Sequence, residues 1–534
     1  MVNIVEVFEK QASLRPEKTA ITIAKKDRYA SLTFGELMQR YELYAANFSA
    51  LGIQKGHKIL LFIRPSLDFS AVTFALFKIG AVPIFIDPGM GRKNLLAAIE
   101  LVQPDGLISE PSVHFLRLIY RQAFKTVRFF MTTGFIRWGE MQRLRDLQKE
   151  NLKPPEVAIK ESDLAAILFT SGGTGRPKGV EYTHKIFVAQ TKALQEIFSL
   201  TAEDIDIPGF PLFSLFTLAM GMTSCIPDMH PGKPAQANPQ KLFKNIMQQR
   251  ATFVAGSPAI WERLADYCQN HGFVLPTVKF LVMFGAPVSL QLLEKFDKIL
   301  PNGSVYTPYG ATECLPVANA AGEFLLEYSK HKNLAGQGTC VGKPIPQIQL
   351  KIIEIVEGPL QNYTELAVGQ VGEIIVAGDL VTRRYHQMED KTWEAKIVEK
   401  GVVWHRMGDL GYIDKAGYLW FCGRKTHRVE ELFSVPCEAI FNQHPAVKRS
   451  ALVGPQISGK IEPSLVVERK DGLQLSGRKR HKFQEELLSL GQGHPHTQTI
   501  QRFYLRKSFP VDVRHNIKID RLKLKNEIEQ GLLQ

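Results

Sequence analysis

A glycine-rich segment, FTSGGTGRPKGV at residues 169–180, constrains this chain more than any other feature. It follows an apolar run at 164–169 that is long enough for one buried strand. The glycines let backbone amides turn toward an anion, the hydroxyl side chains add donors, and Lys178 brings a positive charge. We therefore expect a strand that leads into a phosphate-binding loop, with these candidate ligands: Thr170, Ser171, Gly172, Gly173, Thr174, Gly175 and Lys178.

Two common phosphate-binding motifs do not fit this segment. Gly179 follows Lys178 at the position where a Walker A loop requires Ser or Thr. The glycine spacing is also not GxGxxG, so a dinucleotide-binding fold is not implied. A simple surface turn is the alternative, and the strand directly before the glycines argues against it.

Composition sets broad limits on the class of protein. A chain of 534 residues is too long for one core, so two to four domains are expected. The net charge of +13 suits nucleic acid, a membrane surface or an anionic substrate, and does not choose among them. The six cysteines form no CxxC pair, which indicates neither a zinc site nor a disulfide framework and favours a reducing, cytoplasmic setting.

The first 160 residues alternate between strand-like and helix-like segments. Strands are predicted at 59–63, 81–86 and 106–108, with helices at 67–77 and 93–102. This alternation predicts a layered α/β domain with a largely parallel sheet, whose ligands gather at the carboxyl ends of the strands. The pattern becomes β-rich from about residue 340, and a small mixed α/β unit follows Arg424.

Four further places carry side chains suited to nucleotide chemistry. In FGAPVS, Gly285 and Ala286 are small enough for a flat ring to lie on the backbone, and Pro287 follows them. In YGATE, Tyr309 can cover a base, Gly310 permits close approach, and Thr312 and Glu313 offer oxygen ligands to Mg²⁺. Asp409, expected in a turn between Gly408 and Gly411, suits a ribose diol, although a turn-stabilising aspartate is the alternative. Lys518 is either exposed to solvent or a mobile catalytic cation.

Two apolar or aromatic stretches have alternative interpretations. The uncharged run between Asp206 and Asp228 is interrupted by Pro and Gly, so we expect a buried, pocket-lining helix rather than a membrane span. Its side chains would suit an acyl chain, or could simply be core: Phe210, Leu212, Phe213, Phe216 and Met220. The basic, aromatic stretch 115–141 is expected to be a helix packed on the body, with a membrane-surface or partner-docking helix as the alternative.

Taken together and in this order, these motifs resemble the adenylate-forming superfamily of acyl-CoA synthetases, peptide-synthetase adenylation domains and luciferases. The resemblance implies an α/β fold with a β-rich subdomain in a large N-terminal domain, 1–423, and a small mobile α+β domain, 424–534. It implies ATP-dependent, AMP-forming activation of a carboxylate. By the same resemblance Lys518, Glu313 and Thr170 are catalytic, and Thr170 and Glu313 hold Mg²⁺. Tyr309 and Ala286 would flank adenine, while Asp409 would hold the ribose with Arg424 nearby.

One departure from the superfamily pattern narrows the resemblance. CoA ligases usually carry a glycine-containing loop after the Gly-Arg pair, but this chain has no glycine between Gly423 and Gly454. The segments 210–243, 405–430, 435–454 and 510–519 resemble the OleC-type enzymes, the β-lactone synthetases of bacterial olefin biosynthesis. In that subgroup a long-chain 2-alkyl-3-hydroxy fatty acid is adenylated, and its own β-hydroxyl then closes a four-membered lactone.

This resemblance also implies companion enzymes: a thiolase, a reductase and a β-lactone decarboxylase. A peripheral membrane contact is a further expectation. The alternatives are a long-chain fatty acyl-CoA ligase, a fatty acyl-AMP ligase, and a lipid- or nucleotide-binding module that has lost catalysis. Nucleic acid is not expected as a partner, because the basic run at 478–482 has no interleaved aromatic residues.

Overall fold

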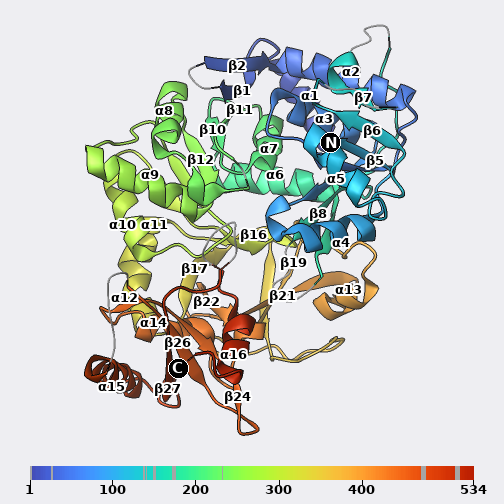
Figure 1. Ribbon diagram of the computed structural model, residues 1–534. Coiled ribbons are helices and arrows are strands. Elements are labelled where there is room, and N and C mark those ends of the chain that lie inside the picture. The colour runs from blue at the N-terminus through green and yellow to red at the C-terminus, as the bar shows by residue number, and fades with distance from the viewer. Residues whose placement is uncertain are drawn as a thin grey trace.

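The computed structural model describes residues 3–25, 28–135, 139, 141–147, 152–170, 176–230, 232–470, 477–511 and 518–533. Two sheets with helices around them form the upper part of the molecule in Figure 1, and the chain ends in a smaller unit at the bottom. A third, antiparallel sheet lies between these parts. The α/β fold class with a separate β-rich part is therefore confirmed.

The first sheet has the order β7-β6-β5-β3-β4-β8-β9 and is parallel except for the antiparallel pair β8 and β9. Its strands are β3 (Lys58–Phe62), β4 (Val82–Ile86), β5 (Gly106–Ser109), β6 (Phe129–Thr132), β7 (Gln142–Arg143), β8 (Leu164–Thr170) and β9 (Lys178–Thr183). The connecting helices are α3 (Leu67–Lys78), α4 (Arg92–Val102) and α5 (Pro111–Ile119). The predicted strands and helices of this region are confirmed. The apolar runs of the strands suit a parallel sheet that is buried on both faces.

The second sheet has the order β14-β13-β12-β10-β11-β1-β2. Its strands are β1 (Thr19–Lys25), β2 (Arg28–Thr33), β10 (Ile205–Pro208), β11 (Thr223–Ile226), β12 (Phe253–Gly256), β13 (Phe280–Met283) and β14 (Ser304–Tyr306). Its outer face is covered by α8 (Pro239–Gln249), α9 (Pro258–His271) and α10 (Leu290–Ile299).

One large core joins the two sheets. Its helices are α1 (Ile4–Leu14), α2 (Phe34–Ala50), α3, α6 (His184–Phe198) and α7 (Ser214–Ala219). Local chemistry sets where these helices begin: Thr33 and Glu36 form a capping box for α2, and the Thr183 side chain caps α6.

The third sheet is antiparallel and carries the β-rich region. Its strands are β15 (Tyr309–Ala311), β16 (Cys314–Asn319), β17 (Thr339–Pro344), β18 (Gln349–Ile353), β19 (Gly372–Ala377), β20 (Lys396–Glu399), β21 (Val402–Ile413) and β22 (Leu419–Arg424). Three short helices occur along this part of the chain: α11 (Gly322–Phe324), α12 (Lys330–Leu334) and α13 (Glu389–Ala395).

The C-terminal unit begins after β22 and has its own small cores. Its main sheet contains β23 (Val447–Val453), β26 (Ser464–Arg469) and β27 (Arg502–Arg506), and a hairpin pairs β24 (Gln456–Ile457) with β25 (Lys460–Ile461). Its helices are α14 (Ser434–Phe441), α15 (Arg478–Gln492) and α16 (Arg521–Glu529). Arg521 and Glu438, on two different helices, form an ion pair of 2.7 Å that ties α16 to α14.

The expectation of a single helix over 115–141 is wrong, and the expected buried, pocket-lining helix of the uncharged run is limited to α7. The described part of 115–141 contains the end of α5, a turn and the strand β6, because its apolar residues include a β-forming run, FFMT. The uncharged run 206–228 is also divided: β10 and β11 enclose a short 3₁₀ turn and α7, because Pro208 to Pro211 prevents a continuous helix. Within the described ranges, no helix is long and apolar enough to cross a membrane.

Candidate functional site

The predicted phosphate loop connects β8 and β9, two neighbouring antiparallel strands. β8 ends at Thr170 and β9 begins at Lys178, and these two residues pair in the strand register. The intervening candidates Ser171, Gly172, Gly173, Thr174 and Gly175 lie outside the described residues. Their role in phosphate binding stays a prediction.

Asp409 is buried at the centre of a polar cluster with Tyr309 and Arg424. The Tyr309 hydroxyl donates to Oδ2 of Asp409 at 2.6 Å, and Arg424 Nη1 lies 3.0 Å from Oδ1. Burial raises the pKa of the Asp409 carboxyl, while Arg424 and the Tyr309 hydroxyl oppose that rise. Among the described residues, Oδ1 accepts no well-aligned hydrogen bond, so it can accept one from a ribose hydroxyl.

The local setting of Asp409 differs from the prediction. Asp409 lies inside the long strand β21 and pairs with Arg424 of β22, whereas a turn between Gly408 and Gly411 was expected. The glycines produce a local irregularity instead: Gly408 has φ +65°, and the strand register shifts at Leu410 and Gly411. Strand pairing therefore overrides the turn chemistry of this sequence.

Thr312 and Glu313 form the two-residue turn of the hairpin between β15 and β16. Gly310 is required here, because a Cβ atom at this position would lie 2.6 Å from the Cys314 carbonyl oxygen. The Tyr385 hydroxyl donates to Glu313 Oε1 at 2.6 Å. Among the described hydrogen bonds none reaches Oε2, so the carboxylate keeps one oxygen that fits a magnesium ligand.

Tyr385 belongs to a segment that docks on β9. Glu181 of β9 accepts hydrogen bonds from Arg384 Nε at 2.5 Å and from His386 Nδ1 at 2.8 Å. Burial of Glu181 tends to raise its pKa, but these two partners lower it overall. Lys178 Nζ lies 4.9 Å from the centre of the Tyr385 ring. The segment thus links Lys178, at the end of the predicted phosphate loop, to Glu313. The sequence around Tyr385 carries no local signal that predicts this contact.

A buried lysine, Lys396, lies behind Glu313. Its ammonium group donates to the backbone carbonyl of Thr382, and the Thr382 amide donates to the Glu313 carbonyl at 2.9 Å. Burial lowers the pKa of Lys396 to about 7, and the charge of Glu313 opposes this. Sequence reasoning did not find Lys396, because strand pairing brings it to the site from a distant segment.

The predicted adenine-flanking residues follow the end of β13. Gly285 has φ +86° and is exposed together with Pro287, and Ala286 is half-buried. The Phe284 amide donates to the carbonyl of Gly256 on the neighbouring strand β12, which fixes the start of this segment. A flat ring can reach this backbone. The ring of Tyr309 packs at 6.0 Å from Phe421 on β22.

An apolar cavity of about 40 Å³ lies between the second sheet and the helices α6 and α7. Three predicted pocket residues line it, Phe213, Phe216 and Met220. Phe210 and Leu212 do not: Phe210 packs on the ring of Phe213 at 5.8 Å, and Leu212 is buried in the core between the sheets. The sequence did not predict that residues of α6, β10, β12 and β13 also line this cavity. Asp206 of β10 is one of these residues.

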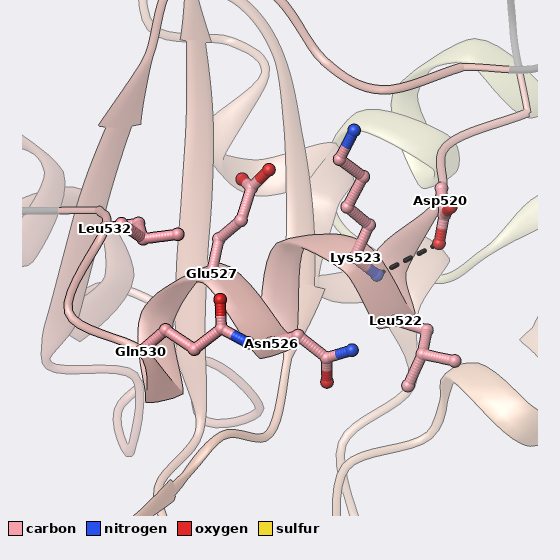
Figure 2. A pocket seen from close by; sticks show the side chains of 7 residues that line it. All are labelled: Asp520, Leu522, Lys523, Asn526, Glu527, Gln530 and Leu532. Carbon is pink, nitrogen blue, oxygen red and sulfur yellow. Dashed lines mark hydrogen bonds between the residues drawn. The ribbon is translucent and has the colours of Figure 1, made fainter.

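Lys518 is exposed and precedes α16 in the C-terminal unit. Figure 2 shows this helix, where Asp520 caps the first turn by accepting from the Lys523 amide at 3.0 Å. The surface hollow in that view is lined by side chains of α16 and its flanks, and none of the predicted site residues lines it. The catalytic role of Lys518 stays a prediction.

The chain is similar to known proteins both in sequence and in fold. The profile of the family described as "AMP-binding enzyme" matches residues 8–386. The chain is 39% identical to an olefin beta-lactone synthetase of Xanthomonas campestris, over 98% of this chain and 97% of that protein. It is 41% identical to another from Stenotrophomonas maltophilia, over 92% and 90%. Among solved structures, O-succinylbenzoate coenzyme A synthetase from Bacillus subtilis with ATP and magnesium ion is similar in fold, with a TM-score of 0.75 and 20% identity over 98% and 99% of the two chains.

Proposed function

Because the chain belongs to the family of AMP-binding, adenylate-forming enzymes, we propose that it is a β-lactone synthetase for long-chain 2-alkyl-3-hydroxy acids. The observation that carries this proposal is the identity of about 40% to two olefin beta-lactone synthetases along nearly the whole of each chain. The segment after Arg424 supports it. There Glu430, not glycine, takes a left-handed φ of +50°, in a turn closed by Val429 and Leu432.

The reaction has two steps with ordinary atom balance. In the first, an oxygen of the substrate carboxylate attacks the α-phosphorus of ATP, and the bond to the β-phosphate breaks to release pyrophosphate. In the second, the β-hydroxyl oxygen attacks the acyl carbon, the bond to AMP breaks, and the hydroxyl proton is released. An internal nucleophile needs no CoA, because it is already held beside the acyl carbon.

Each residue of the site is assigned a role in these two steps. Asp409 accepts from the ribose, with Arg424 beside it, and the backbone of Gly285 to Pro287 faces the adenine. Lys178 and Lys518 reduce the repulsion between the carboxylate and the phosphates. Thr170 and Glu313 would hold Mg²⁺, which supplies positive charge to the phosphates when it is bound. The Tyr385 hydroxyl holds the Glu313 side chain, and the buried Lys396 binds Thr382, whose amide donates to the Glu313 carbonyl.

We place the boundary between the two domains at residues 423 and 424. Support for a boundary near this position comes from the strand β22, whose last residue is Arg424, and from the separate cores of the unit that follows. Movement of this unit about the boundary would bring Lys518 to the site for adenylation.

We extend the proposal to a cytoplasmic enzyme that works with the companion thiolase, reductase and β-lactone decarboxylase.

A peripheral membrane contact would use α5, which exposes Phe115, Leu118 and Ile119 at helical spacing, followed by Arg121 and Lys125. Ile119→Glu should then reduce sedimentation with anionic liposomes. Equal sedimentation of both proteins would contradict the contact.

A matched pair of acids tests the proposed reaction. With the 3-hydroxy acid, ATP and Mg²⁺, AMP should accumulate over many turnovers without CoA. With the same acid lacking the 3-hydroxyl, one equivalent of acyl-adenylate should form and AMP release should stop. Multiple turnover with both acids would contradict lactone closure as the second step.

A further inference from the structure

We propose that Lys425 is a positioning residue for the ribose site. Its side chain ties the end of β22 to β19 and so keeps Arg424 beside Asp409 while the C-terminal unit moves. The inference rests on the proposed function for ATP binding and for the movement of the C-terminal unit, and it is independent of lactone closure.

The ammonium group of Lys425 is held by a buried carboxylate and a backbone carbonyl. Lys425 directly follows β22, and its side chain is 11% exposed. The ammonium group donates to the Val356 carbonyl and lies 3.2 Å from Glu373 Oε2. Glu373 belongs to β19 and is 2% exposed, whereas the exposed Glu357 lies further away, at 3.7 Å. A side chain fixed in this way also restrains its own backbone.

Glu373 does not need Lys425 as its counter-charge. Arg406 Nη2 donates to the same carboxylate oxygen at 2.6 Å. The Arg406 guanidinium also donates to the carbonyls of Val356 and Gly358. One buried carboxylate therefore faces two cations, and the second adds a desolvation cost for little further neutralisation. We attribute this second cation to the position that it gives to the chain at the end of β22.

The tether crosses the strand that carries Asp409. The third sheet has the order β22-β21-β19, so β21 lies between the two ends of the tether. Asp409 of β21 pairs with Arg424, and Glu373 pairs with the neighbouring Leu410. Arg424 is the last residue of β22, a place where a strand frays easily. Lys425 holds the chain directly after this last pair.

The chain passes from one unit to the other within three residues. Lys425 is bound to β19, and Val429 is already buried in the core of the C-terminal unit. Thr426, directly after Lys425, is exposed. Movement of the C-terminal unit is therefore taken up by residues 426–428, and Arg424 stays outside the moving part.

ATP binding tests this role, because it precedes adenylation and needs no acid. In calorimetric titrations with ATP and Mg²⁺, Lys425→Met should raise the dissociation constant about fivefold or more, since Arg424 is no longer held in place. Lys425→Arg keeps a cation for Glu373 and should restore most of the affinity. In pyrophosphate exchange the KM for ATP should rise in the same way, with no change in the KM for the acid.

Lys448→Met is the matched control. Lys448 also lies near a buried carboxylate, Glu468, at 3.3 Å, and Glu468 likewise keeps an arginine, Arg449, at 2.8 Å. This variant should bind ATP like wild type. Equal affinity of Lys425→Met and wild type would overturn the inference alone. A wild-type protein that binds no ATP would overturn the proposed function, and the inference with it.

A labelling measurement on the unchanged protein decides if Lys425→Met does not fold. A short pulse of an amine-reactive ester is given during turnover with ATP and the acid, and the modified lysines are identified by mass spectrometry. Lys425 should stay unmodified while the exposed Lys400 reacts. Modification of Lys425 as fast as Lys400 would mean that the tether opens when the unit moves, and would overturn the inference.

Discussion

The Tyr309 hydroxyl is the smallest group on which the proposed nucleotide site depends. It donates to Oδ2 of Asp409 at 2.6 Å, so that Oδ1, with Arg424 3.0 Å away, is the oxygen proposed to accept from the ribose. In Tyr309→Phe the buried carboxylate loses a charge-assisted hydrogen bond, which typically contributes about 1.5–3 kcal/mol. We expect the KM for ATP to rise about tenfold or more in pyrophosphate exchange. Tyr328→Phe is the matched control, since its hydroxyl donates to Asp414, which is not a predicted site residue. Equal effects of the two variants would contradict the assignment.

The raised pKa of the Asp206 carboxyl predicts that the stability of the protein depends on pH. Burial raises the pKa of the Asp206 carboxyl from its ordinary value of 3.8 to about 7, so the folded state holds the extra proton between these pH values. Stability is therefore greatest below about pH 4 for this group and is lost as pH rises through 7, on the order of 4 kcal/mol in all. Asp206→Asn should remove this loss, so its melting temperature relative to wild type should rise between pH 5 and pH 8. Asp228→Asn, at an exposed ion pair with Lys241, should show no such trend.

At the scale of elements, the segment 384–386 connects β9 to the hairpin between β15 and β16. Glu181 holds Arg384 and His386, and Tyr385 between them reaches Glu313. In Glu181→Gln the carboxylate charge that holds both partners is gone, so Tyr385 and Lys178 should lose their fixed positions. We expect kcat for adenylation to fall about tenfold. Asp379→Asn, which breaks an exposed pair with Lys185, should leave kcat unchanged.

Elements were easier to predict than the contacts between them. The apolar runs of the first sheet predicted β3, β4, β5 and β8, because strands buried on both faces need such runs. The glycines around Asp409 led to the wrong prediction of a turn, since pairing with β22 decides the conformation of this segment. Lys396 and Tyr385 reach Glu313 through pairings between distant segments, and a single sequence carries no local signal for those.

At the scale of the whole molecule, Arg521 holds the C-terminal unit together. It binds the buried Glu438 at 2.7 Å, and Glu438 also accepts from the Leu452 amide at 2.8 Å. Arg521→Ala leaves a buried carboxylate without its counter-charge, which costs about 3 kcal/mol or more. Limited proteolysis should then digest the region after residue 424 first and leave a fragment of residues 1–423. Lys525→Ala, at a surface pair with Glu529, is the control. Loss of both regions at the same rate would contradict two separate domains.

The central claim is that this enzyme activates an acid with ATP and closes it on itself. The most direct test is product analysis of the purified protein with ATP, Mg²⁺ and a long-chain 2-alkyl-3-hydroxy acid, with and without CoA. The account predicts a β-lactone and one AMP per lactone in the absence of CoA, with no change when CoA is added. A thioester that forms only with CoA would contradict it and make the protein an acyl-CoA ligase.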